Sequence, residues 1–329
     1  MHGWQLERLG GPEQLRWTAL PERVPVTGEV HVRIAAAALN FLDTLMLEGR
    51  YQTKPQLPFI PGVEFSGVVE AVGENVRLKV GQTVAGVTAT GAFATHVVVP
   101  ESACMQVPSA LDLVVAASLP IVYPTAWLAL YELGQLKAGE RLLVTAAAGG
   151  VGLAALELAR LRGATVVAMA SESKHAQCLA HGAAAVIDYG PDGGAAALKE
   201  WLAAQKAEGF DVVLDMVGGS AGLAGFKRLA WGGRWLTVGY AGGEIPALPA
   251  NLLLLKQARA IGVWWGEYVK REPAGARRVL NGLFEQLLAG AIKPVISERR
   301  SMAELPQALA SLASRQTTGK VVVVNEVRG

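Results

Sequence analysis

The chain has 329 residues, of which 51% are hydrophobic and 18% charged, with a formal net charge of +2. This length and composition predict two folded domains and exclude an intrinsically disordered chain. The small net charge excludes nucleic acid and anionic membrane surfaces as main partners. Residues 1–10 lack the apolar core of a signal peptide, and no uninterrupted apolar span of about 20 residues occurs. With only two distant cysteines, Cys104 and Cys178, we expect a cytoplasmic protein without disulfides.

The first hundred residues contain short valine-rich runs bounded by glycine and proline. This pattern is typical of a compact, mostly antiparallel β domain. A similar run, "KVVVVNE" at residues 320–326, is expected to return to this domain, after a helix at 301–314 that Ser301 and Glu304 begin as a capping box. The early strands are expected at 29–40, 62–73, 81–89 and 93–100.

After about Leu111, apolar runs alternate with helical stretches. Runs that are apolar on both faces are typical of parallel strands covered by helices on each side. The spacing suits βαβ crossovers and predicts a doubly wound parallel sheet. The expected strands are 141–147, 164–170, 185–189, 210–217, 234–240 and 258–265.

A cluster of small residues, "AAGGVG" at 147–152, stands between the first of these strands and a helix. It fits the frame of the dinucleotide fingerprint, with Ala147, Gly149 and Gly152 at the three glycine positions. Gly149 would let the backbone approach a pyrophosphate, and Gly152 would let helix and strand pack closely. The helix N-terminus, with Gly150 and Val151 in its first turn, would offer N–H groups to the phosphates. A tight turn without a ligand is the alternative.

The end of the second strand decides between NADH and NADPH. NADH-binding proteins place a carboxylate there, about twenty residues after the glycines, to hold the ribose 2′-hydroxyl. In this chain Ser171 occupies the tip and Lys174 begins the next helix, which favours a 2′-phosphate; each charge-assisted contact would contribute about 1.5–3 kcal/mol. Glu172 is the counter-evidence, because its carboxylate could hold the ribose instead. The sequence favours NADPH.

Taken together, these residues resemble the zinc-independent quinone oxidoreductases, the zeta-crystallin-like family of the medium-chain dehydrogenase/reductase superfamily. The resemblance covers essentially the whole chain and rests on segments such as "ALNFLDTLMLEGRY" (38–51), "PFIPGVEFSGVVEAVG" (58–73) and "TTGKVVV" (317–323). It implies an α/β protein with two domains. A GroES-like, mostly antiparallel β domain would span 1–120, completed by 270–329, and a Rossmann domain with a doubly wound parallel sheet would span 121–269.

The resemblance also implies which residues hold NADPH, in addition to the glycine corner. Lys174, Tyr189 and Arg315 match positions that gather around the 2′-phosphate. Thr125 matches a residue near the nicotinamide, and Gly239 and the backbone around Val263 match positions along the cofactor. A homodimer, formed through an edge strand near "ARAIGVWW" (258–265), is expected from the family alone.

A zinc site is not expected. Alcohol dehydrogenases of the same superfamily hold catalytic zinc with a cysteine and a histidine, and zinc needs about four N, S or O donors. Here the cysteine position is Asn40, and the "GHE" position is Gly62-Val63-Glu64. The cysteine-bearing lobe is missing, and the five histidines show no ligand spacing.

Without a metal, the enzyme would need a substrate that is already electron-poor, such as a quinone or an enone. We expect hydride delivery to the β-carbon, with Asn40 and Tyr51 donating hydrogen bonds to the carbonyl oxygen as negative charge builds there. Leu45 stands where some members carry tyrosine, which leaves room for a more apolar enone. The sequence leaves three hypotheses: an NADPH-dependent quinone reductase, an enone or enoyl-thioester reductase, and a non-catalytic NADPH-binding redox sensor.

Overall fold

The computed structural model describes residues 1–325 and divides into two compact units. Unit 1 comprises Met1–Ile121 together with the segment that begins at Pro294, and unit 2 comprises Val122–Lys293. The first boundary lies one residue after the predicted one. The second lies at residue 294 instead of the predicted 270, and residues 326–329 of that predicted range lie outside the described chain.

The second boundary differs because the helices after residue 264 pack on unit 2. Helix α10 (Pro273–Leu288) packs against α9 (Trp265–Arg271) and α3 (Val122–Trp127). Its Val279 and Leu283 are fully buried, and this apolar side ties the helix to α3. Periodicity alone could identify the helix but not the unit that its apolar face covers.

Unit 1 is built on a seven-stranded sheet in the order β14-β15-β3-β4-β5-β7, with β6 also paired with β3. All pairs are antiparallel except β14 with β15, so the predicted mostly antiparallel β domain is confirmed. The predicted last strand is β15, while Glu326 at its expected end lies outside the described residues. The strands are β1 (His2–Leu6) and β2 (Leu15–Ala19), which form a separate pair, and β3 (Glu29–Ala38), β4 (Glu64–Val72), β5 (Thr83–Val87), β6 (His96–Pro100), β7 (Cys104–Gln106), β14 (Ile296–Ser301) and β15 (Lys320–Val324).

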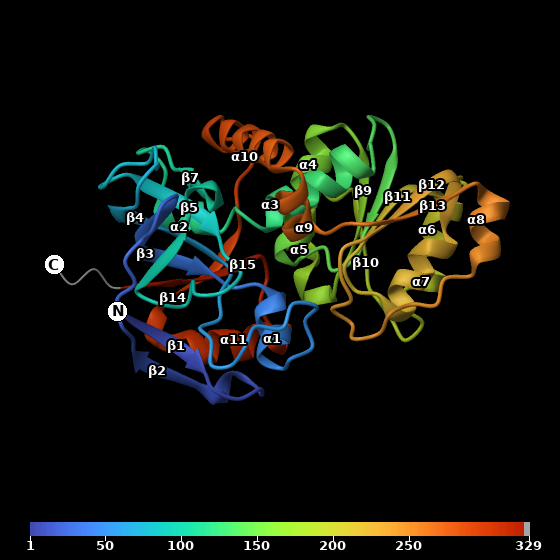
Figure 1. Ribbon diagram of the computed structural model, residues 1–329. Coiled ribbons are helices and arrows are strands. Elements are labelled where there is room, and N and C mark those ends of the chain that lie inside the picture. The colour runs from blue at the N-terminus through green and yellow to red at the C-terminus, as the bar shows by residue number, and fades with distance from the viewer. Residues whose placement is uncertain (326–329) are drawn as a thin grey trace. The chain divides into compact units, whose positions relative to one another are not determined.

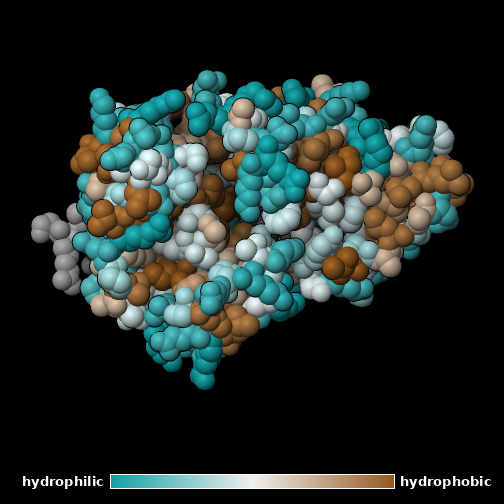
Figure 2. Space-filling view, in the orientation of Figure 1, coloured by the Kyte–Doolittle hydropathy of each residue, from teal (hydrophilic) through white to brown (hydrophobic). Residues whose placement is uncertain are grey.

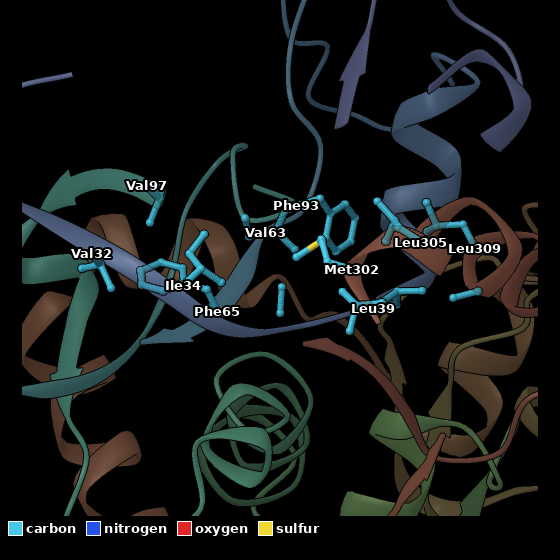
Figure 3. Packing of buried hydrophobic residues seen from close by; sticks show 14 of the residues in the cluster. Val32, Ile34, Leu39, Val63, Phe65, Phe93, Val97, Met302, Leu305 and Leu309 are labelled. Atoms are coloured by element: carbon cyan, nitrogen blue, oxygen red, sulfur yellow. The ribbon is translucent and has the colours of Figure 1, made fainter. Parts of the chain in front are cut away.

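The core of unit 1 follows from alternation along its strands. Val32 and Ile34 of β3 and Phe65 of β4 belong to one apolar cluster (Figure 3). Leu305 and Leu309 of helix α11 (Leu305–Ala313) belong to the same cluster and lie at its other end in this view. Burying each such side chain fully stabilises the fold by about 1.5–3 kcal/mol. The helices are α1 (Phe41–Leu47), α2 (Leu113–Ala117) and α11 (Leu305–Ala313), with short 3₁₀ turns η1 (Pro12–Gln14), η2 (Glu101–Ala103) and η5 (Met302–Glu304).

The predicted capping box at the C-terminal helix is confirmed. Ser301 accepts a hydrogen bond from the backbone of its first turn, and the side chain of Glu304 accepts one from the Ser301 N–H. Together they begin η5, which leads into α11.

Unit 2 is a six-stranded parallel sheet in the order β10-β9-β8-β11-β12-β13, and the predicted doubly wound sheet is confirmed. Helices cover both of its faces (Figure 1). The strands are β8 (Arg141–Val144), β9 (Thr165–Met169), β10 (Ala185–Ile187), β11 (Phe210–Asp215), β12 (Leu229–Thr237) and β13 (Arg259–Gly262). The remaining helices are η3 (Leu128–Leu133, a π-helix), α4 (Gly150–Leu161), η4 (Glu172–Lys174), α5 (His175–Ala180), α6 (Ala195–Ala204), α7 (Gly219–Lys227) and α8 (Ala250–Lys256).

Strand order locates the expected ligand site. The chain adds β9 and β10 on one side of β8 and then crosses to add β11, β12 and β13 on the other. In open parallel sheets a ligand binds beyond the carboxyl ends of the strands where this reversal occurs. The segment that follows β8 is the predicted glycine corner. Within residues 1–325, no helix is both long enough and apolar enough to span a bilayer.

Candidate functional site

The corner between β8 and α4 begins with a strained backbone. Ala146 has φ +47°, in the left-handed region that residues other than glycine rarely adopt. Its N–H donates a hydrogen bond of 2.6 Å to the hydroxyl oxygen of Tyr189. Such strain costs about 1–3 kcal/mol and persists only where neighbouring contacts impose it. At Ala146, the hydrogen bond to Tyr189 is one of those contacts.

Gly152 is required by packing inside the protein. A Cβ atom at this position would overlap the backbone carbonyl oxygens of Ala146 and Ala147. Backbone atoms of a turn cannot move aside as a flexible side chain can. The sequence assigned to Gly152 a close approach of helix and strand. In the structure the close approach is between α4 and the turn residues Ala146 and Ala147, which follow β8.

Gly149 has a different environment. A Cβ atom there would meet only the carbonyl oxygen of Ala146, at 3.2 Å, and otherwise open space. Gly149 is the N-cap of α4 and provides no side-chain hydrogen bond to the first turn, which includes Gly150 and Val151. The first N–H groups of a helix have no partner within it and attract anions. The corner therefore has the open space and the donors that a diphosphate requires.

A buried carboxylate, that of Asp215, holds the residue that directly precedes the glycine corner. Asp215, at the end of β11, accepts hydrogen bonds from the hydroxyl of Thr145 at 2.7 Å and from the N–H groups of Val217 and Gly218. Burial raises the pKa of the Asp215 carboxyl, and these donors oppose the rise. The Thr145 hydroxyl also accepts from the Met216 N–H. This network joins the ends of β8 and β11 at the strand reversal.

The segment after β9 carries the residues expected to select the cofactor. Ser171 is the N-cap of η4. Lys174 is the last residue of η4 and the N-cap of α5, so the predicted placement of Lys174 at a helix start is confirmed. Glu172 is exposed, and its N–H donates to the carboxylate of Asp188 at 3.1 Å. Burial lowers the pKa of the Lys174 ammonium. The contact of Lys174 with a 2′-phosphate stays a prediction.

The hydroxyl of Tyr189 forms two hydrogen bonds to the backbone that the sequence did not predict. Its hydroxyl accepts from the Ala146 N–H and donates to the carbonyl oxygen of Met169 at 3.0 Å. A phenol has a single O–H to donate. Tyr189 therefore connects the end of β9 to the glycine corner, and its predicted contact with the 2′-phosphate stays a prediction.

The other predicted cofactor residues lie on several elements. Thr125 is a buried residue of α3, the helix that directly precedes the π-helical segment η3. Gly239 follows β12 and has open space where a Cβ atom would stand. Val263 follows β13, and its N–H donates to the Thr237 carbonyl oxygen at 2.9 Å. Arg315 follows α11 in unit 1, with φ +59°, whereas Lys174 belongs to unit 2, so their predicted meeting at one phosphate also stays a prediction.

In unit 1 three buried side chains form a closed ring. The ammonium of Lys320 donates to the side-chain oxygen of Asn40 at 2.8 Å and to the carboxylate of Glu64. The amide nitrogen of Asn40 donates to the same Glu64 oxygen at 2.8 Å. Burial raises the pKa of the Glu64 carboxyl, and the neighbouring ammonium opposes the rise. We call these three residues the Asn40 ring.

One residue of the ring, Asn40, also begins the helix that follows it. Asn40 is the N-cap of α1 and forms a capping box with Asp43, whose carboxylate accepts from the Asn40 N–H at 2.7 Å. Asp43 is fully buried, and burial raises the pKa of its carboxyl to about 7. Tyr51, the other predicted donor, follows α1 and is half-buried against the unit 1 core. The roles of Asn40 and Tyr51 toward a substrate stay predictions.

Sequence reasoning missed Lys320, Asp43 and the Thr145–Asp215 pair. The Asn-x-x-Asp spacing at 40–43 is a helix-start signal, and a lysine at the head of the apolar strand β15 is a charge that must find a partner. Nothing in the sequence reveals that Lys320 meets Asn40, which lies 280 residues away. In the described chain, no group of three or more His, Cys, Asp and Glu residues could hold a metal ion. The positions aligned with the zinc motifs, Asn40 and Glu64, are bridged by the Lys320 ammonium.

Comparisons with known proteins identify the family. Residues 26–109 match the family model "Alcohol dehydrogenase GroES-like domain", and residues 150–281 match "Zinc-binding dehydrogenase". A curated relative from Nematostella vectensis, "Quinone oxidoreductase-like protein 2 homolog", is 38% identical over 90% of this chain and 82% of its own length. The quinone oxidoreductase of Thermus thermophilus, also solved with NADPH, is 37% identical, with a TM-score of 0.85 over 98% of this chain and 100% of that one. The CurK enoyl reductase is 26% identical, with a TM-score of 0.88 over 99% of each chain.

The chain therefore belongs to the zinc-independent quinone oxidoreductase family of the medium-chain dehydrogenase/reductase superfamily. It is an oxidoreductase of that superfamily, and the predicted family is confirmed.

Proposed function

We propose that this protein is an NADPH-dependent reductase that transfers hydride to quinones or related electron-poor carbonyl compounds. The observation that carries the proposal is the glycine corner, which offers a diphosphate open space at Gly149 and an uncapped helix start at α4. NADPH supplies the hydride when it is bound. The relative from Thermus thermophilus was solved with this cofactor, which supports the same cofactor here.

Unit 1 supplies the hydrogen-bond donor. As negative charge builds on the substrate oxygen, a donor placed in a dry, preorganised site stabilises it. One hydrogen of the Asn40 amide nitrogen is committed to Glu64, and the other has only a long contact of 3.4 Å to the Ala38 carbonyl oxygen. We assign this second hydrogen to the substrate oxygen, together with the hydroxyl of Tyr51. No metal ion enters this scheme.

The test follows the loss of NADPH absorbance with three acceptors: a 1,4-benzoquinone, a 2-enone and an enoyl thioester. We expect the fastest turnover with the quinone. Faster turnover with the enone or thioester would make the protein an enone or enoyl-thioester reductase, an alternative that the likeness to CurK enoyl reductase and the half-buried Leu45 favour. Binding of NADPH without turnover of any acceptor would contradict the proposal and support a redox sensor.

The environment of the two cysteines does not favour redox sensing through a thiol. Burial raises the pKa of the Cys104 thiol to about 12 and that of Cys178 to about 11. The thiolate is the reactive form, so both residues are unreactive at neutral pH. Both are free thiols. We propose a cytoplasmic location for the protein.

Replacing Lys174 by alanine is expected to weaken NADPH binding roughly 10- to 100-fold, because one charge-assisted contact with the 2′-phosphate is lost. NADH lacks that phosphate, and its affinity should stay within about twofold. Titration of cofactor fluorescence measures both affinities. Lys199→Ala, an exposed lysine of α6, is the matched control. Equal losses for the two cofactors would mean that Lys174 has another role.

Replacing Tyr189 by phenylalanine is expected to weaken NADPH and NADH binding equally, by about tenfold. The substitution leaves the Ala146 N–H without the hydroxyl that accepts its hydrogen bond, and such a loss costs about 1–3 kcal/mol. The Met169 carbonyl oxygen loses one of its two donors and keeps the Ala147 N–H at 3.0 Å. The same fluorescence titrations give the result. A loss confined to NADPH would show instead that the hydroxyl binds the 2′-phosphate.

We further propose a homodimer formed through the exposed edge strand β13. The nearby surface is apolar: Ile245, Leu254 and Leu255 are 71%, 81% and 63% exposed, and apolar side chains gather over α8 (Figure 2). An unpaired edge strand beside such a patch favours pairing with a second copy. Light scattering should give about twice the chain mass of 34.5 kDa for the wild type and one chain mass for Leu254→Glu/Leu255→Glu. Leu179→Glu, on α5, is the control. A monomeric wild type would contradict the dimer.

A further inference from the structure

The Asn40 ring joins three distant parts of unit 1. Asn40 begins α1, Glu64 begins β4 and Lys320 begins β15. All three hydrogen-bonding directions of the ammonium are occupied, by Asn40, by Glu64 and by the Leu39 carbonyl oxygen at 2.7 Å. The second oxygen of Glu64 accepts from the Ile121 N–H at 3.1 Å.

The ring fixes which way the Asn40 amide faces. An ammonium can only donate, so the atom of Asn40 that faces Lys320 must be the oxygen Oδ1. A carboxylate can only accept, so the atom that faces Glu64 must be the nitrogen Nδ2. Rotating the amide by 180° would turn its NH₂ group to the ammonium and its oxygen to the carboxylate. The two charges therefore exclude the reversed orientation.

Stability alone does not account for a ring of this kind. Glu64 is fully buried and Lys320 is 4% exposed. Taking two charges out of water is costly, and well-packed apolar residues commonly replace a buried ion pair without loss of stability. What apolar residues could not do is orient the amide of Asn40. The ring is thus better explained by orientation than by stability.

We propose that Lys320 is a positioning residue, which with Glu64 holds the Asn40 amide so that its second N–H hydrogen faces the substrate oxygen. The proposal rests on the proposed function, because it assigns Asn40 a substrate. In the reversed orientation an amide oxygen would face the substrate oxygen, and two acceptors repel. Lys320 acts only through Asn40 and does not itself contact the substrate.

The key variant is Lys320→Met/Glu64→Gln, which removes both charges together. Glutamine can donate to or accept from Asn40, so the amide is no longer forced to face one way. Because no charge is left unpaired, the fold should survive, whereas Lys320→Met alone strands the buried carboxylate and is expected to be unstable. The matched control is Arg33→Met/Glu70→Gln, which removes a half-exposed ion pair of the same sheet.

We expect the double variant to stay folded, with its melting temperature lowered only by the loss of the donor to the Leu39 carbonyl oxygen, and to keep its NADPH affinity. We expect kcat for a 1,4-benzoquinone to be reduced about tenfold, with KM nearly unchanged. Adding both substitutions to Asn40→Ala should reduce kcat no further, because Lys320 and Glu64 then have no Asn40 amide to position. Loss of stability in step with kcat would indicate a purely structural role and would overturn the proposal. So would wild-type kcat in the double variant.

A second readout does not depend on turnover. In protein labelled with ¹⁵N-asparagine, the Asn40 side-chain amide is assigned by its absence in Asn40→Ala. We expect one sharp NH₂ pair in the wild type and a broadened or doubled pair in the double variant. If the wild type turned over no acceptor, the proposed function would fail, but this spectrum would still test the orientation. An unchanged spectrum in the double variant would overturn the proposal, and wild-type kcat in Asn40→Ala would overturn the substrate contact.

Discussion

Replacing Gly152 by alanine is expected to destabilise the protein by about 3 kcal/mol and to abolish measurable NADPH binding. The added methyl group would overlap the carbonyl oxygens of Ala146 and Ala147, and overpacking against backbone costs about 1–3 kcal/mol or more. Relieving the overlap must move α4 or the turn, and both carry the proposed phosphate site. Urea unfolding and cofactor fluorescence measure the two effects.

The neighbouring variant Gly149→Ala separates the fold from the ligand. Its methyl group would meet one carbonyl oxygen at 3.2 Å and otherwise stand in the open space assigned to the diphosphate. We therefore expect nearly wild-type stability with NADPH affinity reduced at least about tenfold. If Gly149→Ala bound NADPH as the wild type does, the diphosphate would not lie in this corner.

Replacing Asp43 by asparagine is expected to remove a large part of the pH dependence of stability. Burial raises the pKa of Asp43 from 3.8 to about 7 in the folded protein, so the folded state holds a proton that the unfolded state has released. Between about pH 4 and 7 the folded state binds more protons, and stability therefore falls as pH rises. From about pH 5 to pH 8 the wild type should lose about 3 kcal/mol more than Asp43→Asn.

Urea unfolding at these two pH values gives this difference. Comparing slopes instead of absolute stabilities removes any pH-independent effect of the new amide. Glu64, whose pKa burial also raises, is present in both proteins. Asp192→Asn tests the sign of the pH effect, because the pKa of this carboxyl is shifted in the opposite direction to that of Asp43. Hydrogen bonds from backbone N–H groups lower the pKa of the exposed Asp192 carboxyl. A wild type and an Asp43→Asn variant with the same slope would contradict the prediction.

The fold was largely predictable because its signals are local. Six apolar runs separated by helical stretches determine a parallel sheet, and the spacing from strand to glycines to helix places the corner at its edge. The boundary at residue 294 was not predictable, because it depends on which unit the apolar face of α10 covers.

The site was predictable only in part. The roles of Gly149 and Gly152 could be predicted because a glycine has no side chain, so its position in a motif indicates where the backbone needs open space or close packing. The hydroxyl of Tyr189 was assigned to a phosphate from the resemblance, and its bonds to Ala146 and Met169 appear only when the strands are placed side by side. The Asn40 ring depends on a contact across 280 residues, which no local pattern encodes.

The late position of β15 has a consequence for synthesis. Unit 2 is one continuous stretch, Val122–Lys293, and can fold once that stretch has left the ribosome. Unit 1 cannot complete its sheet until Lys320–Val324 pairs with β3. Until then the nascent chain carries Glu64 without its counter-ion and an open edge on β3. Residues Met1–Ile121 thus precede unit 2 in the chain, yet their sheet is completed only after unit 2 has been synthesised.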